Sequence, residues 1–445
     1  MKILILGLGI NGGGLSAARY FAGKAEVRIS DIGQRSSFGT VPDELEALGI
    51  TCFFADTDPR DNIKWADVVI KNPAIPSKLP QLSLAKNIRN DFSYLFSSPL
   101  TKDISFILVT GTKGKSTTVA AITHALNTLG NEALYCGNIG VSAFLILEEL
   151  EKRKLSGLKM PSYIVAELSS WQIHDTYVAL NGQMPSSRLT ILTSLYRDHQ
   201  NRYASLADYY DDKLLLLNDR AERILINIRN RPYVLKHTHK LSKRISVFPT
   251  ISNPYSLNKM ELACAYKALK LLGFAKKEIV RALSSYRGMP HRIEQVAVHD
   301  DIMFINDSSA TISEAVSFSV KTLYPLSYHL ICGGTDKDIS ASGMLPALRN
   351  ATDISLLDGS FTRDKLIPLL EKHEIRYSGP YSDLKSAFDN ACQRAEEKKS
   401  ATGAMQVVIL SPGAASFEMF RNEFDRGDSF KKLVREYVSP YRART

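Results

Sequence analysis

Short apolar runs alternate with amphipathic segments along the first 98 residues of the chain. The run ILILGLG at 3–9 is typical of a strand buried on both faces, and a helix is expected through Ala17–Phe21. Further strands are predicted near 51–54 and 67–71, followed by a turn at Asn72-Pro73-Ala74. This alternation predicts an α/β fold with a parallel sheet.

The alternation begins again after the Ser/Pro-rich junction Ser97-Ser98-Pro99. A strand is predicted at 104–110, a helix at Val119–Leu129, and apolar runs follow at 163–173 and 189–199. Because 445 residues exceed what one hydrophobic core organises, two or three domains are expected.

The most informative segment is ISFILVTGTKGKST at 104–117, in which a strand runs into a glycine-bracketed loop. Gly111 and Gly114 allow backbone N–H groups to approach phosphate oxygens, Lys115 supplies a cation for the β and γ phosphates, and Ser116 supplies a hydroxyl for Mg²⁺. The full Walker pattern would have a glycine at Val109, so this is a shortened variant. It predicts a nucleoside-triphosphate site, with an ordinary turn before a helix as the alternative.

A second glycine loop follows the first strand of the chain. Gly7, Gly9 and Gly12 form GxGxxG, and VRISD ends in Asp31 about where a dinucleotide fold keeps its ribose-binding acid. This pattern alone is a weak signal. It favours a small Rossmann-like domain that holds a nucleotide, not necessarily NAD, and the alternative is a doubly wound domain with an empty crevice.

Polar residues also fall at the ends of the later apolar runs. GNIG occupies 137–140, the run at 163–173 delivers Glu167 and Ser169, and the run at 189–199 ends in Asp198 and His199. Since ligands of open parallel sheets bind at the carboxyl ends of strands, these groups predict an ATP·Mg²⁺ site beside the glycine loop. Glu167 is a hard oxygen ligand, and a second metal could be shared with His199; by itself His199 would more often be a surface residue.

Composition narrows the class of protein. The apolar and charged fractions are those of a globular protein, and neither a secretory signal nor an apolar stretch of membrane-spanning length is found, so a cytoplasmic location without a membrane partner is expected. Five cysteines without CxxC spacing argue against a zinc cluster or a disulfide framework. The formal charge of +10 is spread along the chain, which favours attraction of phosphorylated small molecules over nucleic acid.

Eight ordered motifs give the chain a family resemblance over nearly its whole length. They are GTKGKST, GNIG, ELSSWQI, RDHQNRY, GMPHRIE, INDSSAT, ICGGTDK and LSPGAASFEMFRNEFDRG. In order and spacing they resemble the Mur ligases, and among these the members that add D-glutamate to UDP-N-acetylmuramoyl-L-alanine. The resemblance implies a monomeric, ATP- and Mg²⁺-dependent amide ligase of cytoplasmic peptidoglycan synthesis that proceeds through an acyl phosphate. It also implies three domains: a Rossmann-like UDP-substrate domain at 1–98, a P-loop ATPase domain at 99–287 and a Rossmann-like amino-acid domain at 288–445.

The resemblance assigns roles residue by residue. The catalytic residues would be Lys115, His199 and Lys213, the last as a carbamate that helps hold a second Mg²⁺; an ordinary solvated helix lysine is the alternative. Metal ligands would be Ser116, Glu167, His199 and Lys213. ATP would contact Gly111, Thr112, Lys113, Gly114, Lys115, Ser116, Thr117, Asn258, His291, Arg292 and Asp307. The UDP substrate would contact Gly9, Ile10, Asn11, Asp31, Asn72 and Asn138, and the amino acid would contact Thr311, Lys337, Ser416 and Phe424.

The chain departs from the family pattern at several of these motifs. The family lysine of DSKATN is Ser309 and its asparagine is Ile312, while Glu423 stands where an aromatic lines the glutamate site, with Phe424 next to it. The usual Asn-x-Thr-Glu before Asp198 reads Ser-Leu-Tyr-Arg at 194–197, and HNxxN retains only Asn258. These changes put the identity and stereochemistry of the amino acid in doubt.

Other functions stay open at this point. A Mur-type ligase for another amino acid, such as L-glutamate, would carry the same ATP machinery. A lysine or diaminopimelate ligase would be expected to carry DNPR, which is absent from the sequence, and a folylpolyglutamate synthase has its phosphate loop near the N-terminus. A non-catalytic nucleotide sensor would need the glycine loops but not Glu167, His199, Lys213 and Lys337 together.

Overall fold

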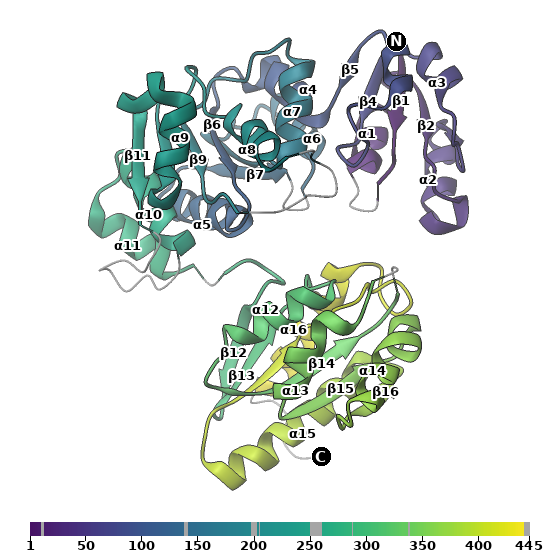
Figure 1. Ribbon diagram of the computed structural model, residues 1–445, viewed down its shortest axis with the longest axis vertical. Coiled ribbons are helices and arrows are strands. Elements are labelled where there is room, and N and C mark those ends of the chain that lie inside the picture. Colours follow the sequence, from purple (N-terminus) through teal and green to yellow (C-terminus); the bar gives the residue numbers. More distant parts are fainter. Residues whose placement is uncertain are drawn as a thin grey trace. The chain divides into compact units, whose positions relative to one another are not determined.

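The computed structural model describes residues 1–9, 13–137, 141–196, 203, 205–249, 260–286, 288–336 and 339–439. The chain forms two compact units, Met1–Tyr286 and Arg287–Thr445. The first unit contains two sheets and the second contains one, and Figure 1 shows the sequence running from purple through green to yellow across them. Each unit is described by itself.

The first sheet is parallel, with strand order β3-β2-β1-β4-β5. Its strands are β1 (Lys2–Leu6), β2 (Glu26–Ser30), β3 (Thr51–Phe53), β4 (Val68–Lys71) and β5 (Ile88–Arg89). Its helices are α1 (Gly13–Phe21), α2 (Val41–Ala47) and α3 (Arg60–Trp65), while α4 (Asp91–Ser97), which follows β5, packs against helices of the central sheet. The strand order reverses direction between β1 and β4, so the loops after these two strands flank the crevice where such sheets bind ligands.

The central sheet is also parallel, with order β11-β10-β9-β6-β8-β7. Its strands are β6 (Ser105–Thr110), β7 (Ala133–Gly137), β8 (Tyr163–Glu167), β9 (Leu189–Leu192), β10 (Ile224–Asn227) and β11 (Ile245–Phe248). Its helices are α5 (Lys115–Thr128), α6 (Ala143–Leu155), α7 (Ser170–Ala179), α8 (Leu206–Leu214), α9 (Arg231–Thr238), α10 (Met260–Leu271) and α11 (Lys276–Ser284). β6 lies in the interior of the sheet and five of its six residues are buried, which explains its uninterrupted apolar sequence.

The third sheet has order β12-β13-β17-β14-β15-β16 and is parallel except for its edge strand β12. Its strands are β12 (Glu294–His299), β13 (Ile302–Asn306), β14 (Ser327–Gly333), β15 (Asp353–Leu357), β16 (Ser378–Tyr381) and β17 (Gln406–Leu410). Its helices are α12 (Ser313–Lys321), α13 (Leu345–Asn350), α14 (Ile367–Lys372), α15 (Leu384–Thr402) and α16 (Glu423–Val438). Asp300 and Asp301, both at positive φ, form the tight turn that makes β12 antiparallel to β13.

The first and central sheets are joined by a shared hydrophobic cluster. Phe21 of α1, Tyr94 of α4 and Phe144 of α6 pack ring against ring, with centroids 5.2–5.6 Å apart. Edge-to-face and tilted aromatic contacts of this kind add to the apolar area that is buried. Both sheets therefore belong to one compact unit.

The α/β fold predicted from the sequence is confirmed, as are the helices through Ala17–Phe21 and Val119–Leu129. The apolar run at 163–173 differs from a single strand, because β8 ends at Glu167 and α7 begins at Ser170. Ser169 is the N-cap of α7. Its hydroxyl accepts a hydrogen bond from the Gln172 amide, and its own amide donates to Gln172 Oε1. No helix within the described ranges is long and apolar enough to cross a membrane.

Candidate active site

The glycine loop after β6 has the backbone that its sequence requires. Gly111 and Gly114 both adopt positive φ, at 145° and 83°, and Gly114 is the residue from which α5 starts. A Cβ at Gly111 would lie 2.9 Å from the Ser194 amide nitrogen and closer still to Thr193 Oγ1. The loop therefore leads directly into a helix N-terminus, which is the arrangement that binds phosphate.

The end of β9 supports this loop through hydrogen bonds. The amide of Thr112 donates to the Ser194 carbonyl (2.8 Å) and the amide of Lys113 donates to Ser194 Oγ (2.8 Å), while Thr193 Oγ1 donates to the Lys113 carbonyl (2.6 Å). Two of the amides predicted to contact ATP thus have protein partners here, and Lys115 Nζ donates to the Thr112 carbonyl (3.2 Å). Ser194, which departs from the family motif, therefore stabilises the phosphate loop by accepting hydrogen bonds from two of its amides.

Glu167 is placed beside the loop by the register of the sheet. It is the last residue of β8, pairs with Val109 of β6 on one side and with Gly137 of β7 on the other, and is 1% exposed. Val109 lies two residues before Gly111, so the carboxylate belongs to the same sheet edge as the loop. The sequence prediction that Glu167 lies next to the glycine loop is confirmed.

Lys213 is buried at the same edge, unlike an ordinary solvated helix lysine. Lys213 is 2% exposed, and its Nζ donates to the Gly111 carbonyl (3.2 Å) and lies 4.6 Å from the ring centroid of Tyr209. The preceding residue, Asp212, accepts from Tyr203 (2.8 Å) and lies 2.9 Å from His174 Nδ1 of α7, and hydrogen bonding to this carboxylate raises the pKa of His174. These bonds fix the last turn of α8 against α7.

The first glycine loop is closed by side chains that sequence analysis assigned to the UDP substrate. Asp31 accepts from the amide of Leu8 through Oδ2 and from the amide of Gly33 through Oδ1, both at 2.7 Å. Gly9 has no room for a Cβ because Asn72 Nδ2 occupies that space, and Asn72 Oδ1 accepts from the amide of Ala74 (2.9 Å). Asp31 therefore holds the loop by accepting hydrogen bonds from backbone amides. A contact between Asp31 and a ribose stays a prediction.

In the second unit, His291 is a buried residue at positive φ (63°). Asn306 Nδ2 donates to His291 Nδ1 (3.0 Å) and also bonds Glu294 Oε2 (2.9 Å), so the imidazole proton resides on Nε2. Burial lowers the pKa of His291, which favours this neutral form. The following residue, Arg292, is exposed.

Asp307, Thr311 and Ser416 lie on loops that follow strands of the third sheet, and Phe424 lies in the first turn of α16. Asp307 is buried and accepts from the amide of Ile293 (3.1 Å) and the hydroxyl of Ser411 (2.7 Å), and desolvation raises its pKa. Ser416 is 3% exposed, and its hydroxyl has no hydrogen-bond partner among the residues that the structure describes. Thr311 is half-buried, while Phe424 is 41% exposed and lies edge-on to His291.

Sequence analysis missed Arg426, which holds these loops together. Its guanidinium, 1% exposed, donates to the hydroxyl and carbonyl of Ser308 and to the carbonyls of Ala414 and Ala415, at 3.0–3.2 Å. Burial lowers the pKa of Arg426 to about 9, so the group stays charged at neutral pH. The only signal in the sequence was its place in the motif NEFDRG, which does not distinguish a buried arginine from an exposed one.

Some predicted site residues fall outside the described ranges. They are Ile10, Asn11, Asn138, His199, Asn258 and Lys337, together with Asp198 of the strand-end motif. Their roles stay predictions.

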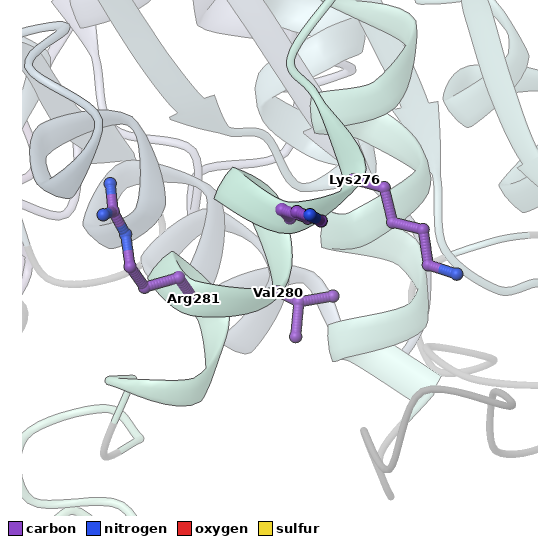
Figure 2. Close-up of a pocket in the computed structure, with 4 residues that line it drawn as sticks. Lys276, Val280 and Arg281 are labelled. Carbon is purple, nitrogen blue, oxygen red and sulfur yellow. The ribbon is translucent and has the colours of Figure 1, made fainter.

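Two surface cavities lie apart from the predicted site residues. One, of about 470 Å³, lies along α11 and is lined by Lys276, Lys277, Val280 and Arg281; Figure 2 shows the Lys276 and Arg281 side chains pointing away from each other. The other, of about 530 Å³, lies in the second unit between 339–342 and 365–372. Neither lining includes a residue predicted to bind ATP, the UDP substrate or the amino acid.

Comparisons with known proteins agree with this geometry. The Mur ligase middle domain matches residues 109–267, which contain the phosphate loop, Glu167 and Lys213. The UDP-N-acetylmuramoylalanine--D-glutamate ligase of Borreliella afzelii is 31% identical over 98% of this chain and 97% of its own length. The enzyme of the same name from Roseiflexus is 27% identical over 98% and 99%.

Solved structures support the fold. The UDP-N-acetylmuramate-alanine ligase MurC of Thermotoga maritima superposes with a TM-score of 0.55 at 17% identity, covering 98% of this chain and 99% of that one. A UDP-N-acetylmuramoyl-L-alanyl-D-glutamate--2,6-diaminopimelate ligase gives 0.54 at 16%, covering 98% and 92%. With a relative 31% identical over nearly the full length of both chains, this chain belongs to the Mur ligase family, among the UDP-N-acetylmuramoylalanine--D-glutamate ligases.

Proposed function

We propose that this protein is an ATP-dependent ligase that joins D-glutamate to UDP-N-acetylmuramoyl-L-alanine in the synthesis of peptidoglycan precursors. The observation that carries the proposal is the meeting of the phosphate loop, Glu167 and buried Lys213 at one edge of the central sheet, in a chain whose full-length relatives bear that name. The reaction has two steps. The alanyl carboxylate takes the γ-phosphoryl group with release of ADP, and the glutamate amine then displaces phosphate from the acyl carbon.

Lys115 and Ser116 would serve the first step. A carboxylate is a poor acyl donor, so the γ-phosphoryl group must be neutralised and held in line with the attacking oxygen. Lys115 begins α5 and can neutralise the phosphate, and the Ser116 hydroxyl can bind Mg²⁺. The bound Mg²⁺ would supply charge neutralisation between the phosphates and the acyl oxygen.

The side chains present fit Mg²⁺ held largely by substrate oxygens. Within the described ranges, no cluster of three or more His, Cys, Asp and Glu residues could enclose a metal by itself. Glu167 and Ser116 offer one oxygen group each, and Mg²⁺ commonly binds one or two protein oxygens together with phosphates and water. Glu167 therefore suits a metal that arrives with ATP.

For Lys213 we propose carbamylation. Its neutral amine would add to CO₂, forming an N–C bond and releasing a proton, and the resulting carboxylate would bind a second Mg²⁺ that His199 would share. The burial of Nζ at the Gly111 carbonyl supports this, since an ammonium group there would repel a metal. Lys213→Ala should be inactive and partly rescued by formate or acetate; Lys102→Ala, an exposed lysine of the same unit, should behave as wild type. Full activity of Lys213→Ala without added acid would refute the carbamate.

The remaining roles are proposed on the same basis. Gly9 and Asn72 would form the UDP-substrate loop with Asp31 behind it, and Thr311, Ser416 and Lys337 would hold glutamate, with Phe424 beside them. His291, Arg292 and Asp307 would contact ATP. We also propose domain boundaries at 98/99 and 287/288, a monomer, and a cytoplasmic reaction.

The decisive experiment measures phosphate release from ATP with UDP-N-acetylmuramoyl-L-alanine and each of a panel of amino acids. D-glutamate should give the highest kcat/KM, ahead of L-glutamate and aspartate. Equal or higher kcat/KM with a neutral amino acid would show that Ser309, Ile312 and Glu423 have rebuilt the pocket. Phosphate release that does not depend on any amino acid would point instead to a nucleotide-hydrolysing or sensing protein.

A further inference from the structure

A buried ion pair joins the first sheet to a helix of the central sheet. Lys71, the last residue of β4, places Nζ 2.7 Å from Asp175 Oδ2 on α7, and the two side chains are 3% and 6% exposed. Lys71 Nζ also donates to the Ile75 carbonyl (2.8 Å), and Ser77 Oγ donates to Asp175 Oδ1 (2.8 Å). The loop at 72–77 is thus tied to one carboxylate of the central sheet from both of its ends.

This loop is the one that closes the first glycine loop. Asn72 fills the space beside Gly9, and its side chain is fixed by the amide of Ala74. A displacement of Lys71 would therefore move Asn72 and the surface that faces the glycine loop. Lys71 itself is buried, with its side chain 3% exposed.

Asp175 is connected to the phosphoryl-transfer site through its own helix. α7 begins at Ser170, three residues after Glu167, and its N-cap Ser169 is locked by Gln172. One turn further along, Asn90 at the start of α4 donates to Thr176 Oγ1 (2.9 Å), and both residues are buried. α7 therefore carries the candidate metal ligand before its first turn and the contact with the first sheet on its body.

Stability alone does not explain two charges at this position. Removing a lysine and an aspartate from water costs free energy that their attraction offsets only when the geometry is good, and an apolar pair of similar volume is often equally stable. Unlike an apolar contact, the ion pair is directional. Its hydrogen-bonding atoms allow only one arrangement of loop 72–77 on α7. The ion pair between Lys24, in the turn after α1, and Glu151 of α6 has the same short distance (2.6 Å) but is much more exposed, at 45% and 33%.

We propose that Lys71 and Asp175 are positioning residues that set the distance between the UDP-substrate loop and the phosphate loop. This inference rests on the proposed function, in which the acceptor carboxylate lies at the far end of a substrate anchored by its UDP group. An error of about 1 Å at the anchor would carry the carboxylate out of line with the γ-phosphate, and such errors can cost about 100-fold in rate. Neither residue touches the substrate.

The test compares steady-state kinetics of Asp175→Asn, Lys71→Met and the apolar pair Lys71→Met/Asp175→Leu. Glu151→Gln is the control, because the ion pair of Glu151 with Lys24 also joins the segment between β1 and β2 to a helix of the central sheet. Each single variant should raise KM for UDP-N-acetylmuramoyl-L-alanine and lower kcat by at least about tenfold each, with KM for ATP within about threefold of wild type. The apolar pair should fold, as shown by its melting temperature, and still show the raised KM. Glu151→Gln should match wild type.

Wild-type kinetics in both single variants, or in the apolar pair, would overturn the positioning role. If the single variants do not fold, the apolar pair together with Ser77→Ala decides, and raised KM for the UDP substrate in both is the expected result. If the wild-type enzyme does not ligate D-glutamate, the proposed function is refuted instead. Failure of the positioning role and failure of the proposed function are therefore distinguishable.

Discussion

Replacing Gly427 by alanine should disturb the second unit through one residue, His291. Gly427 lies within α16, where glycine is ordinarily about 1 kcal/mol less favourable than alanine. Its Cβ would, however, lie 2.9 Å from His291 Cε1 and closer still to Nδ1, and 3.1 Å from Asn306 Nδ2. The imidazole therefore occupies the space that a methyl group needs.

The ring cannot move aside without loss. The backbone of His291 is held by bonds from its amide to Glu294 Oε2 (2.8 Å) and from the Ser309 amide to its carbonyl (2.9 Å). Turning the ring would break its bond with Asn306, worth about 0.5–1.5 kcal/mol, and overpacking adds about 1–3 kcal/mol. After subtracting about 1 kcal/mol of helix propensity, we expect Gly427→Ala to destabilise the second unit by about 0.5–3.5 kcal/mol.

The assay is scanning calorimetry of the full chain, combined with KM for ATP. Gly427→Ala should lower the melting transition of the second unit and, because His291 is predicted to reach the nucleotide, raise KM for ATP. In a His291→Ala background the same glycine change should be nearly neutral or stabilising, since the clash is gone. An equal cost of Gly427→Ala in both backgrounds would refute the reasoning.

Three further predictions follow from the first unit. Lys115→Ala should lower the ligation rate by about 10²–10³ while the melting temperature stays that of wild type, because one preorganised cation is lost; a rate within a few-fold of wild type would reject the loop assignment. Gly111→Ala should weaken ATP binding measured by titration calorimetry more than Lys115→Ala does, because its Cβ would displace Thr193 and Ser194, and unchanged binding would contradict the described packing. Desolvation raises the pKa of Asp91 to about 6, so the folded state binds this proton more tightly than the unfolded chain and stability should fall as pH rises from about 4 to about 6. Asp91→Asn should remove that fall and be more stable than wild type at pH 7.5 by up to about 3 kcal/mol in urea unfolding; an unchanged pH profile would count against the raised pKa of Asp91.

The strands and the two glycine loops could be predicted from the sequence because each is dictated locally. A strand buried on both faces needs an uninterrupted apolar run, and a loop at positive φ needs glycine, as at Gly111 and Gly114. The run at 163–173 shows the limit of this reasoning, since apolar composition is the same for a buried strand and a buried helix. Ser169 and Gln172, spaced as a capping box, were the local signal for the start of α7.

The partners of charged side chains could not be predicted, because they depend on residues distant in sequence. Asp31 was assigned to a ribose by its spacing, yet both of its oxygens accept from backbone amides of nearby loops. Lys213 is buried because the last turn of α8 packs against the phosphate loop. Its hydrogen-bond partner there, Gly111, lies 102 residues away in the sequence. Spacing in the sequence predicts which residues form the site and leaves open which groups they contact.

Arg426 clarifies what the substitution of lysine by Ser309 means for the third sheet. Positive charge is not lost from this segment, because the Arg426 guanidinium bonds both the carbonyl and the hydroxyl of the adjacent Ser308. Being 1% exposed, however, it is occupied by loop oxygens and cannot also contact a substrate carboxylate. Its charge therefore acts on the geometry of the segments that carry Thr311 and Ser416. If the predicted site is right, direct contact with glutamate would fall to those two hydroxyls and to Lys337. The panel of amino acids would then test a site with one cation fewer than the family pattern provides.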